Sequence, residues 1–257
     1  MDLQPQLEVA KIAAKKAAQE ILKIYESGDF SIEAKADNSP LTKADRAAHL
    51  AIVAELEKTN LPILSEEGRD ISYEERKDWE YFWMIDPLDG TKEFIKRNGE
   101  FTVNIALIHK NQPILGVVQV PVTRKLYYAS EGEGSFVISE EGSQRLKVNG
   151  KKLSEKGMKI VASRSHLNED TEKFMSQFSN PEIVSMGSSL KLLAVAEGLA
   201  DLYPRFAPTM EWDTAAAHAI VTEAGGTVSI KESNQSVHYN KPNLLNPHFL
   251  VSGSITM

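Results

Sequence analysis

The stretch WMIDPLDGTKEFI, residues 83–95, joins a buried-strand pattern to a turn that carries two carboxylates. The hydrophobic run 82–85 predicts a strand that ends at Asp86, and Asp89 follows three positions later. Aspartates often form turns, but turn formation does not explain why an aromatic run should end in both. Oxygen ligands of this kind are the ones that Mg²⁺ prefers, so the stretch predicts a cation site at a strand end.

Gly90 and Thr91 extend this turn and offer backbone N–H groups to an anion. Exposed N–H groups at the start of a helix bind phosphate through their geometry and the local dipole. A plain capping role for Thr91 is the alternative, and the two roles are compatible. Metal and phosphate chemistry at one strand end is therefore the first hypothesis.

The composition is that of an ordinary globular protein, with 257 residues of which 42% are hydrophobic and 25% charged. The formal net charge of −7 argues against a general binder of nucleic acids or anionic membranes, although a local site can still be positive. The chain has no cysteine, which excludes disulfides, thiolate metal ligands and cysteine nucleophiles. The six histidines are scattered without an HExxH-like pair, so a zinc hydrolase is disfavoured.

Targeting signals are not visible in the sequence. The first residues lack a basic segment followed by a long apolar run, so we expect no signal peptide. No stretch approaches the roughly 20 apolar residues of a transmembrane helix, so we expect no integral membrane segment. A cytoplasmic protein is the expectation, while peripheral association with the inner membrane and the oligomeric state stay open.

Helical periodicity dominates the start of the chain. Apolar residues recur at three- and four-residue steps over 3–27, which predicts an amphipathic helix that ends at Gly28. A second helix is predicted from Thr42 to Thr59, after a turn-like segment. A short strand at 62–64 then leads into the charged segment 69–80, which we interpret as a surface excursion.

Runs rich in Val, Ile, Tyr and Phe predict an antiparallel meander in the middle of the chain. The runs are Thr102–His109, Ile114–Val120, Lys125–Ala129 and Gly134–Ile138. The polar segment 139–158, rich in Gly and Lys, is interpreted as a linker between two domains, 1–150 and 151–257. The first domain would carry most of the metal ligands.

Strands and helices alternate in the second domain, which favours an α/β arrangement. Buried strands are predicted at Lys159–Ala162 and Ile183–Ser185, and helices at Ser188–Gly198 and Asp213–Ala224.

Further carboxylates lie at the ends of predicted elements. Glu66 and Glu67 follow a predicted strand, and Asp213 opens a helix. Taken alone, the two glutamates favour a solvated turn and Asp213 favours a helix N-cap. Asp45 stands three residues after Thr42, the spacing of a capping box, and the local sequence favours that role for it.

Hydroxyl and cationic side chains lie near strand ends in the second half, where α/β folds place ligands. His166 belongs to the segment SRSH, Ser188 and Lys191 belong to GSSLK, and Arg205 belongs to YPRF. Lys191 and Arg205 could pair with a phosphate. A surface lysine and a structural arginine are the alternatives.

Three segments resemble, in order and spacing, the metal motifs of the inositol monophosphatase superfamily: SEEG (65–68), WMIDPLDGTKEF (83–94) and EWDTAAAHAIVTEAGG (211–226). The resemblance implies a Mg²⁺-dependent, often lithium-sensitive phosphatase. It also implies the layered αβαβα sandwich of sugar phosphatases, with an antiparallel sheet in an α+β first half and a mixed α/β second half. Ala217 departs from the motif, which often has glycine there, and the stretch after SEEG matches no pattern that we recognise.

A closer resemblance is to the bacterial branch of 3′(2′),5′-bisphosphate nucleotidases. It is carried by residues 89–108, by KADNSPLTKAD (35–45), and by SRSH, GSSLK and YPRF. Inositol phosphatases usually have a Thr-Asn-Phe variant where this chain has Lys92-Glu93-Phe94. The branch implies hydrolysis of adenosine 3′,5′-bisphosphate to AMP and phosphate, a step linked to sulfate assimilation.

Two alternatives accompany this hypothesis. One is an inositol monophosphatase or another sugar phosphatase of the same superfamily, acting for instance on fructose 1,6-bisphosphate. The other, from a different class, is a non-catalytic nucleotide or metal sensor. A sensor should have lost part of the site, whereas this chain retains every matched carboxylate.

The resemblance assigns site residues by their position in the motifs. It implies two or three Mg²⁺ ions held by Glu66, Asp86, Asp89, Asp213 and the backbone carbonyl of Leu88. Glu67 is adjacent to the matched glutamate, and we expect it to contact the metal ligands without binding the metal itself.

Roles for water activation and substrate binding follow in the same way. Asp45 and Thr91 are implied to orient and deprotonate the attacking water, which demotes the capping role of Asp45. The implied partner is a small nucleotide bisphosphate and not a nucleic acid. The substrate contacts are implied for Gly90, Thr91, His166, Ser188, Lys191, Arg205 and Asp213.

Overall fold

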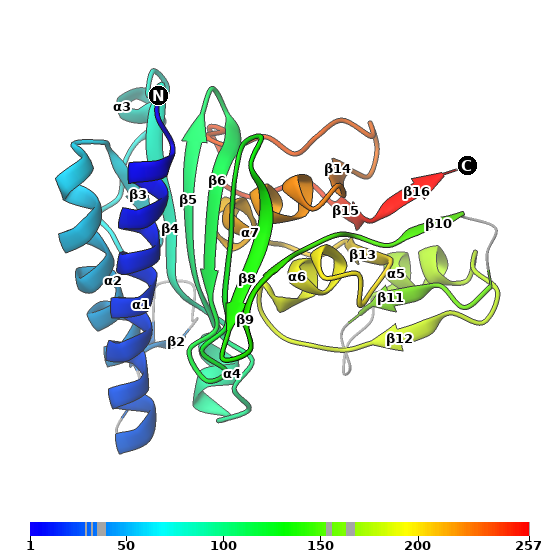
Figure 1. Ribbon diagram of the computed structural model, residues 1–257, viewed down its shortest axis with the longest axis horizontal. Helices are drawn as coiled ribbons and strands as arrows, with labels where there is room; N and C mark the ends of the chain where they lie inside the picture. The colour runs from blue at the N-terminus through cyan, green and yellow to red at the C-terminus, as the bar shows by residue number, and fades with distance from the viewer. Residues whose placement is uncertain (29, 32, 35–39, 153–155, 163–167, 257) are drawn as a thin grey trace.

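The computed structural model describes residues 1–28, 30–31, 33–34, 40–152, 156–162 and 168–256. Helices and two large sheets alternate in these residues as five layers in the order α, β, α, β, α (Figure 1). The predicted layered sandwich, with an antiparallel first sheet and a mixed second half, is confirmed. Within the described ranges, no helix combines the length and the apolar character needed to cross a membrane.

A seven-stranded sheet forms the second layer, and its strand order follows the chain from β3 to β9. Neighbouring strands are antiparallel except β3 and β4, which are parallel. The predicted meander is confirmed, since its apolar runs are buried on both faces of the sheet. The strands are β3 (Ile63–Ser65), β4 (Tyr81–Asp89), β5 (Thr102–His109), β6 (Gln112–Gln119), β7 (Leu126–Ser130), β8 (Gly134–Ser139) and β9 (Gly142–Arg145).

The two helices predicted at the start of the chain are present, and they cover the outer face of this sheet (Figure 1). They are α1 (Gln4–Ser27) and α2 (Lys43–Leu56), which continues into the 3₁₀ turn η1 (Glu57–Thr59); the short strands β1 (Glu33–Ala34) and β2 (Pro40–Leu41) lie between the helices in sequence. Successive side chains of β4 point to opposite faces of the sheet. Trp83 packs in the core that the sheet forms with α1 and α2, and Met84 packs in the core on the other face. Gly28 ends α1 in the left-handed region, with φ of 74°.

The middle layer contains α6 and α7, which lie between the two sheets (Figure 1). The second sheet has the order β12-β11-β13-β15-β14, and α5 packs on its outer face around Met158 and Leu202. A separate parallel pair is formed by β10 and β16. The elements are β10 (Gly150–Lys152), β11 (Lys159–Val161), α5 (Glu169–Met175), β12 (Glu182–Val184), α6 (Leu190–Ala196), β13 (Leu202–Arg205), α7 (Glu211–Glu223), β14 (Thr227–Ile230), β15 (Phe249–Ser252) and β16 (Ser254–Thr256).

The segment 69–80 is not the plain surface excursion that we predicted. It contains helix α3 (Tyr73–Arg76), which Ser72 caps, and the side chain at its end is buried, with Arg76 only 2% exposed. The helix and its buried arginine could not be predicted from the sequence for two reasons. A helix of four residues is too short to show a period, and arginine is rarely buried unless it finds partners.

The predicted linker 139–158 is also wrong in part. It contains β9, which extends the first sheet, and β10, which pairs with β16. Every residue of β9 is exposed, so the strand lacks the apolar alternation from which a strand can be predicted. The strand predicted as buried near Ile183 is β12, an edge strand in which Ile183 is 52% exposed.

One core runs through both halves of the chain. Val118 of the first sheet, Ile220 of α7 and Val251 of the second sheet belong to the same buried cluster. The first sheet ends at Arg145 and the second begins at Lys159. A division into two domains at residue 150 stays a prediction.

Gly116 in β6 allows α7 to lie close to the first sheet. A Cβ atom built on Gly116 would lie 2.1 Å from the carbonyl oxygen of Ala216 in α7. Gly116→Ala must therefore displace the helix, and we expect it to lower the free energy of unfolding by about 1–3 kcal/mol, the usual cost of overpacking. The melting temperature should fall by about 2–4 °C per kcal/mol. Gly150→Ala is the control, because the nearest atom to its new Cβ lies 3.9 Å away; equal melting temperatures for the two variants would contradict the prediction.

Candidate active site

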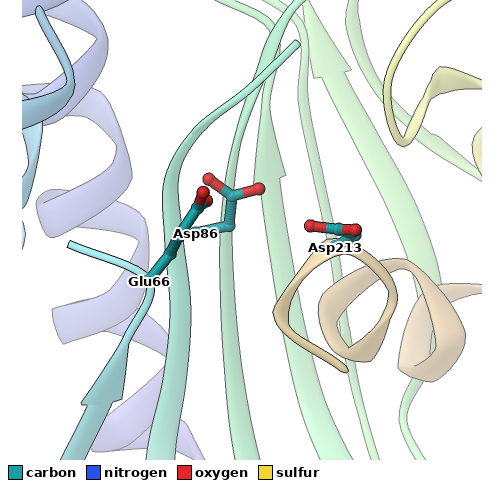
Figure 2. Close-up of side chains that lie close together, drawn as sticks. All are labelled: Glu66, Asp86 and Asp213. Carbon is teal, nitrogen blue, oxygen red and sulfur yellow. The ribbon is translucent and has the colours of Figure 1, made fainter. Parts of the chain in front are cut away.

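The structure brings the carboxylates of Glu66, Asp86 and Asp213 together (Figure 2). Each offers an oxygen atom within 4.8 Å of the others. The parallel pairing of β3 with β4 sets Ser65 opposite Ile85, so Glu66, directly after β3, lies beside Asp86 of β4. Asp213 comes from the first turn of α7 on the other side (Figure 2). Three sequence segments thus meet in one cluster of carboxylates, and we refer to Glu66, Asp86 and Asp213 together as the acidic group.

Burial makes this acidic group unfavourable in the absence of a cation. The carboxyl of Asp86 is 1% exposed, and burial, followed by the charges of Glu66, Asp89 and Asp213, raises its pKa well above the ordinary range. Burial is also the first cause that raises the pKa of Asp213, with Asp89 and Glu66 next. Carboxylate oxygens that lie close together and repel one another, with Asp86 buried and the other two partly buried, suit a divalent cation such as Mg²⁺.

Asp89 lies outside this three-carboxylate group, and residues of the second half hold its side chain. Its Oδ2 atom accepts hydrogen bonds from the Ser188 hydroxyl at 2.6 Å and from the Ser189 backbone N–H at 2.7 Å. We predicted that this strand ends at Asp86, and that prediction is wrong. The strand β4 continues to Asp89 across an irregularity in its pairing with β5. That irregularity accommodates the turn-like residues without ending the strand.

Asp45 and Thr91 lie together, although they are far apart in the sequence. The Thr91 hydroxyl donates to Asp45 Oδ1 at 3.3 Å. The Thr42 backbone N–H donates to Asp45 Oδ2 at 2.7 Å, so the capping box that we had demoted is present. Both roles are compatible because they use different oxygens of one carboxylate. Thr91 itself is not an N-cap: it is the first residue of α4 (Thr91–Ile95), and Gly90 occupies the cap position.

The backbone conformation at position 90 requires glycine, because its φ of 93° lies in the left-handed region. A Cβ atom there would also lie only 3.1 Å from the Glu100 carbonyl oxygen. The Leu88 carbonyl oxygen lies 3.4 Å from the Thr91 hydroxyl and is a second possible acceptor for the proton that also faces Asp45. His166, predicted to contact substrate, lies outside the described residues.

A cavity of about 170 Å³ opens next to the acidic group. Burial lowers the pKa of Lys191 in this cavity, and Asp89 is the largest opposing influence. Arg205 donates to the Thr209 hydroxyl and, at 3.0 Å, to the Pro208 carbonyl, so part of its guanidinium is held within its own turn. The lining includes the predicted residues Asp89, Gly90, Ser188, Lys191, Arg205 and Asp213.

The cavity is also lined by residues that the sequence analysis missed, among them Glu93, Ser189 and Tyr203. Burial raises the pKa of Tyr203 to about 12, so its hydroxyl stays neutral at neutral pH. Ser189 is adjacent in sequence to a predicted residue and belongs to the quoted segment GSSLK. Glu93 and Tyr203 had no local signal beyond membership of a quoted segment.

Comparisons with known proteins agree with this geometry. Residues 2–251 match the model of the inositol monophosphatase family. The 3′(2′),5′-bisphosphate nucleotidase CysQ of Salmonella typhimurium is 43% identical over 242 residues, which cover 93% of this chain and 96% of the relative. The family resemblance inferred from the motifs is thereby confirmed.

Solved structures give the same result. The crystal structure of CysQ from Bacteroides thetaiotaomicron, described as a bacterial member of the inositol monophosphatase family, matches with a TM-score of 0.88 and 48% identity over 98% of both chains. Inositol monophosphatase from Anabaena matches with a TM-score of 0.76 and 24% identity over 99% of this chain and 93% of the other. The second likeness supports the fold alone.

The repulsion within the acidic group predicts the behaviour of Asp86→Asn. The amide keeps the acceptor for the Leu88 N–H, which Asp86 Oδ1 now binds at 3.0 Å, and removes one buried charge. With a chelator at pH 8, the variant should melt higher than the wild-type protein by at least about 2–4 °C, the shift that 1 kcal/mol produces at about this size.

The pH dependence follows from the direction of the pKa shift. A carboxyl whose pKa is raised by folding stabilises the fold below its unfolded value of about 3.9 and loses that contribution as the pH rises through the folded value. The advantage of the variant should therefore shrink as the pH falls towards 4, and added Mg²⁺ should stabilise the wild-type protein more than the variant. Calorimetry in chelator that found the wild-type protein equally stable or more stable at pH 8 would contradict this account.

Proposed function

The chain belongs to the inositol monophosphatase family, and we propose that it is a Mg²⁺-dependent 3′(2′),5′-bisphosphate nucleotidase that removes the 3′-phosphate of adenosine 3′,5′-bisphosphate. The relatives that carry this enzyme name cover 93% of the chain at 43% identity. The carrying observation is the position of Lys191 and Arg205, which line the same cavity as Asp89 and Asp213. Two cations beside an acidic metal site suit a substrate with two phosphates.

The proposed metal ligands are Glu66, Asp86 and Asp213, with Asp89 and the Leu88 carbonyl as further donors for a set of two or three ions. The donor set consists of oxygens, and the buried carboxylates need positive charge, so the residues fit Mg²⁺. When bound, Mg²⁺ would supply Lewis acidity that favours ionisation of water and neutralises charge on the phosphoryl oxygens.

Thr91 and Asp45 would direct the attacking water and remove its proton. Thr91 donates to Asp45 Oδ1, which leaves the hydroxyl oxygen able to accept a hydrogen bond from the water. As the water oxygen bonds to phosphorus, a proton passes through the Thr91 hydroxyl to Asp45. The bond from phosphorus to the ribose 3′-oxygen breaks, and that oxygen takes a proton from solvent water and leaves as the hydroxyl of AMP. Because Thr42 fixes the other oxygen of Asp45, the carboxylate cannot turn away.

The remaining proposed residues would bind the nucleotide. Gly90 and Thr91 N–H groups would hold the reacting phosphoryl group, and Lys191, Arg205, Ser188 and His166 would hold the nucleoside and the second phosphate. Catalysis is then mainly positioning and charge stabilisation, as expected for a loose phosphoryl-transfer transition state. We further propose that the enzyme acts in the cytoplasm on the nucleotide by-product of sulfate assimilation.

The substrate assignment is tested by comparing turnover of adenosine 3′,5′-bisphosphate with that of inositol 1-phosphate at saturating Mg²⁺. We expect the nucleotide to have the higher kcat/KM, and a chelator to abolish its turnover. Asp86→Asn should lower turnover by more than about 100-fold, the upper range for loss of a residue that only supports a metal ligand. Faster hydrolysis of inositol 1-phosphate would favour the sugar-phosphatase alternative, and an inactive wild-type protein that binds the nucleotide would favour the sensor.

The variant Lys191→Ala tests whether Lys191 binds the second phosphate of the substrate, the one that is not hydrolysed. A charge-assisted hydrogen bond contributes about 1.5–3 kcal/mol, so kcat/KM for adenosine 3′,5′-bisphosphate should fall by roughly 10- to 100-fold. Turnover of a simple monophosphate should fall much less. Lys15→Ala, on the exposed side of α1, is the control with the same loss of charge. Equal losses for both substrates would remove Lys191 from the second-phosphate site.

A further inference from the structure

A buried polar network joins the segment between Glu66 and Asp86 to the start of α7. Arg76, at the end of α3, is 2% exposed, and Glu211, the first residue of α7, is fully buried. The loop 238–246 lies between them and contacts both. None of these residues has a part in the proposed reaction.

Arg76 ties α3 to this loop with several hydrogen bonds. Its Nη1 donates to Asn240 Oδ1 at 2.6 Å, and its Nη2 donates to the Lys241 carbonyl at 2.7 Å. Asn240 Nδ2 donates in return to the Arg76 carbonyl at 2.8 Å. The planar guanidinium suits such a fork of acceptors, and the compact ammonium of lysine does not.

Glu211 ties the same loop to α7. Its carboxylate accepts the Asn240 N–H at 2.6 Å, the Lys241 N–H at 3.0 Å and the Lys241 ammonium at 2.6 Å. The Glu211 N–H donates to the Leu244 carbonyl at 2.9 Å. A buried carboxylate with this many donors is costly to disturb, because the remaining partners would be left unpaired.

The loop also holds the residues on either side of Asp213. Asn246 Nδ2 donates to the Met210 carbonyl at 3.0 Å and to the Thr214 hydroxyl at 2.9 Å. The Met210 N–H donates to Asp213 Oδ2 at 2.9 Å. The place of Asp213 therefore depends on contacts that continue through the loop to Arg76, in the segment that connects Glu66 with Asp86.

We propose that Arg76, Asn240 and Glu211 are positioning residues that set the metal affinity of the site. They hold the start of α7, and with it Asp213, against the segment that joins the other two carboxylates. This inference rests on the proposed function in one respect, since it requires the acidic group to bind a divalent cation. Carboxylates that repel one another separate when their support loosens, and the cation then loses a ligand at its bonding distance.

The test measures metal binding directly. Mn²⁺ binding is followed by electron paramagnetic resonance in the wild-type protein, Arg76→Lys and Glu211→Gln. Loss of residues that orient metal ligands typically weakens affinity 10- to 100-fold, and we expect about 10-fold here. The Mg²⁺ concentration for half-maximal activity should rise by the same factor, while kcat at saturating Mg²⁺ and KM for the nucleotide should change little.

Asp201→Asn controls for general destabilisation. Asp201 is 1% exposed and accepts the Lys159 N–H at 2.7 Å and the Lys151 ammonium at 2.8 Å. It precedes β13, at the other end of that strand from Arg205. Asp201→Asn should lower the melting temperature without changing Mn²⁺ affinity.

The outcomes separate the two proposals. Unchanged Mn²⁺ affinity in Arg76→Lys and Glu211→Gln would overturn the positioning role, and so would an equal loss of affinity in Asp201→Asn. If one of the two network variants fails to fold, the other decides. A wild-type protein that binds no Mn²⁺ would overturn the proposed metal site itself, and the positioning role with it.

Discussion

The close approach of mutually repelling carboxylates, one of them fully buried, is the constraint on which the rest of the structure depends. Asp86 is nearly inaccessible to water, and Glu66, Asp89 and Asp213 all raise its pKa further. Asp86 is buried and the other three are only partly exposed, so water screens these charges weakly and the fold holds them in place through other contacts. The parallel pair β3–β4 provides that support for Glu66 and Asp86, the Ser188-Ser189 turn provides it for Asp89, and the buried network around Glu211 provides it for the start of α7.

Two of the site's aspartates also serve as helix-capping residues. Asp45 in α2 and Asp213 in α7 each occupy the third helical position and accept the backbone N–H of the cap residue. A carboxylate there is favoured by the exposed N–H groups of the first helical turn. The capping box predicted for Asp45 is present, whereas Asp213 is not the N-cap residue that we predicted, because Met210 occupies that position. Capping fixes one oxygen of Asp45, and this orients the other towards Thr91.

Most of the fold could be predicted because its elements bury apolar residues with a regular period. The helix α1 and the strand β5 were found close to their true bounds for this reason. The elements that were missed or misjudged lack such a period. The strand β9 is wholly exposed, α3 has four residues, and β12 lies at a sheet edge where an apolar side chain remains in solvent. None of them carries the regular apolar pattern from which an element can be predicted.

The sequence by itself determined the chemistry that this protein can offer: oxygen ligands without cysteine, a threonine beside a glycine turn, and cations in the second half. Only the tertiary structure decided that Asp89 would be held by Ser188 and Ser189, about a hundred positions away, and that Arg76 would be buried against Asn240, 164 positions away. Residue types and their spacing record local preferences, which is why carboxylates at strand ends could be recognised. Contacts over such separations arise from the packing of whole layers, and no local pattern encodes them.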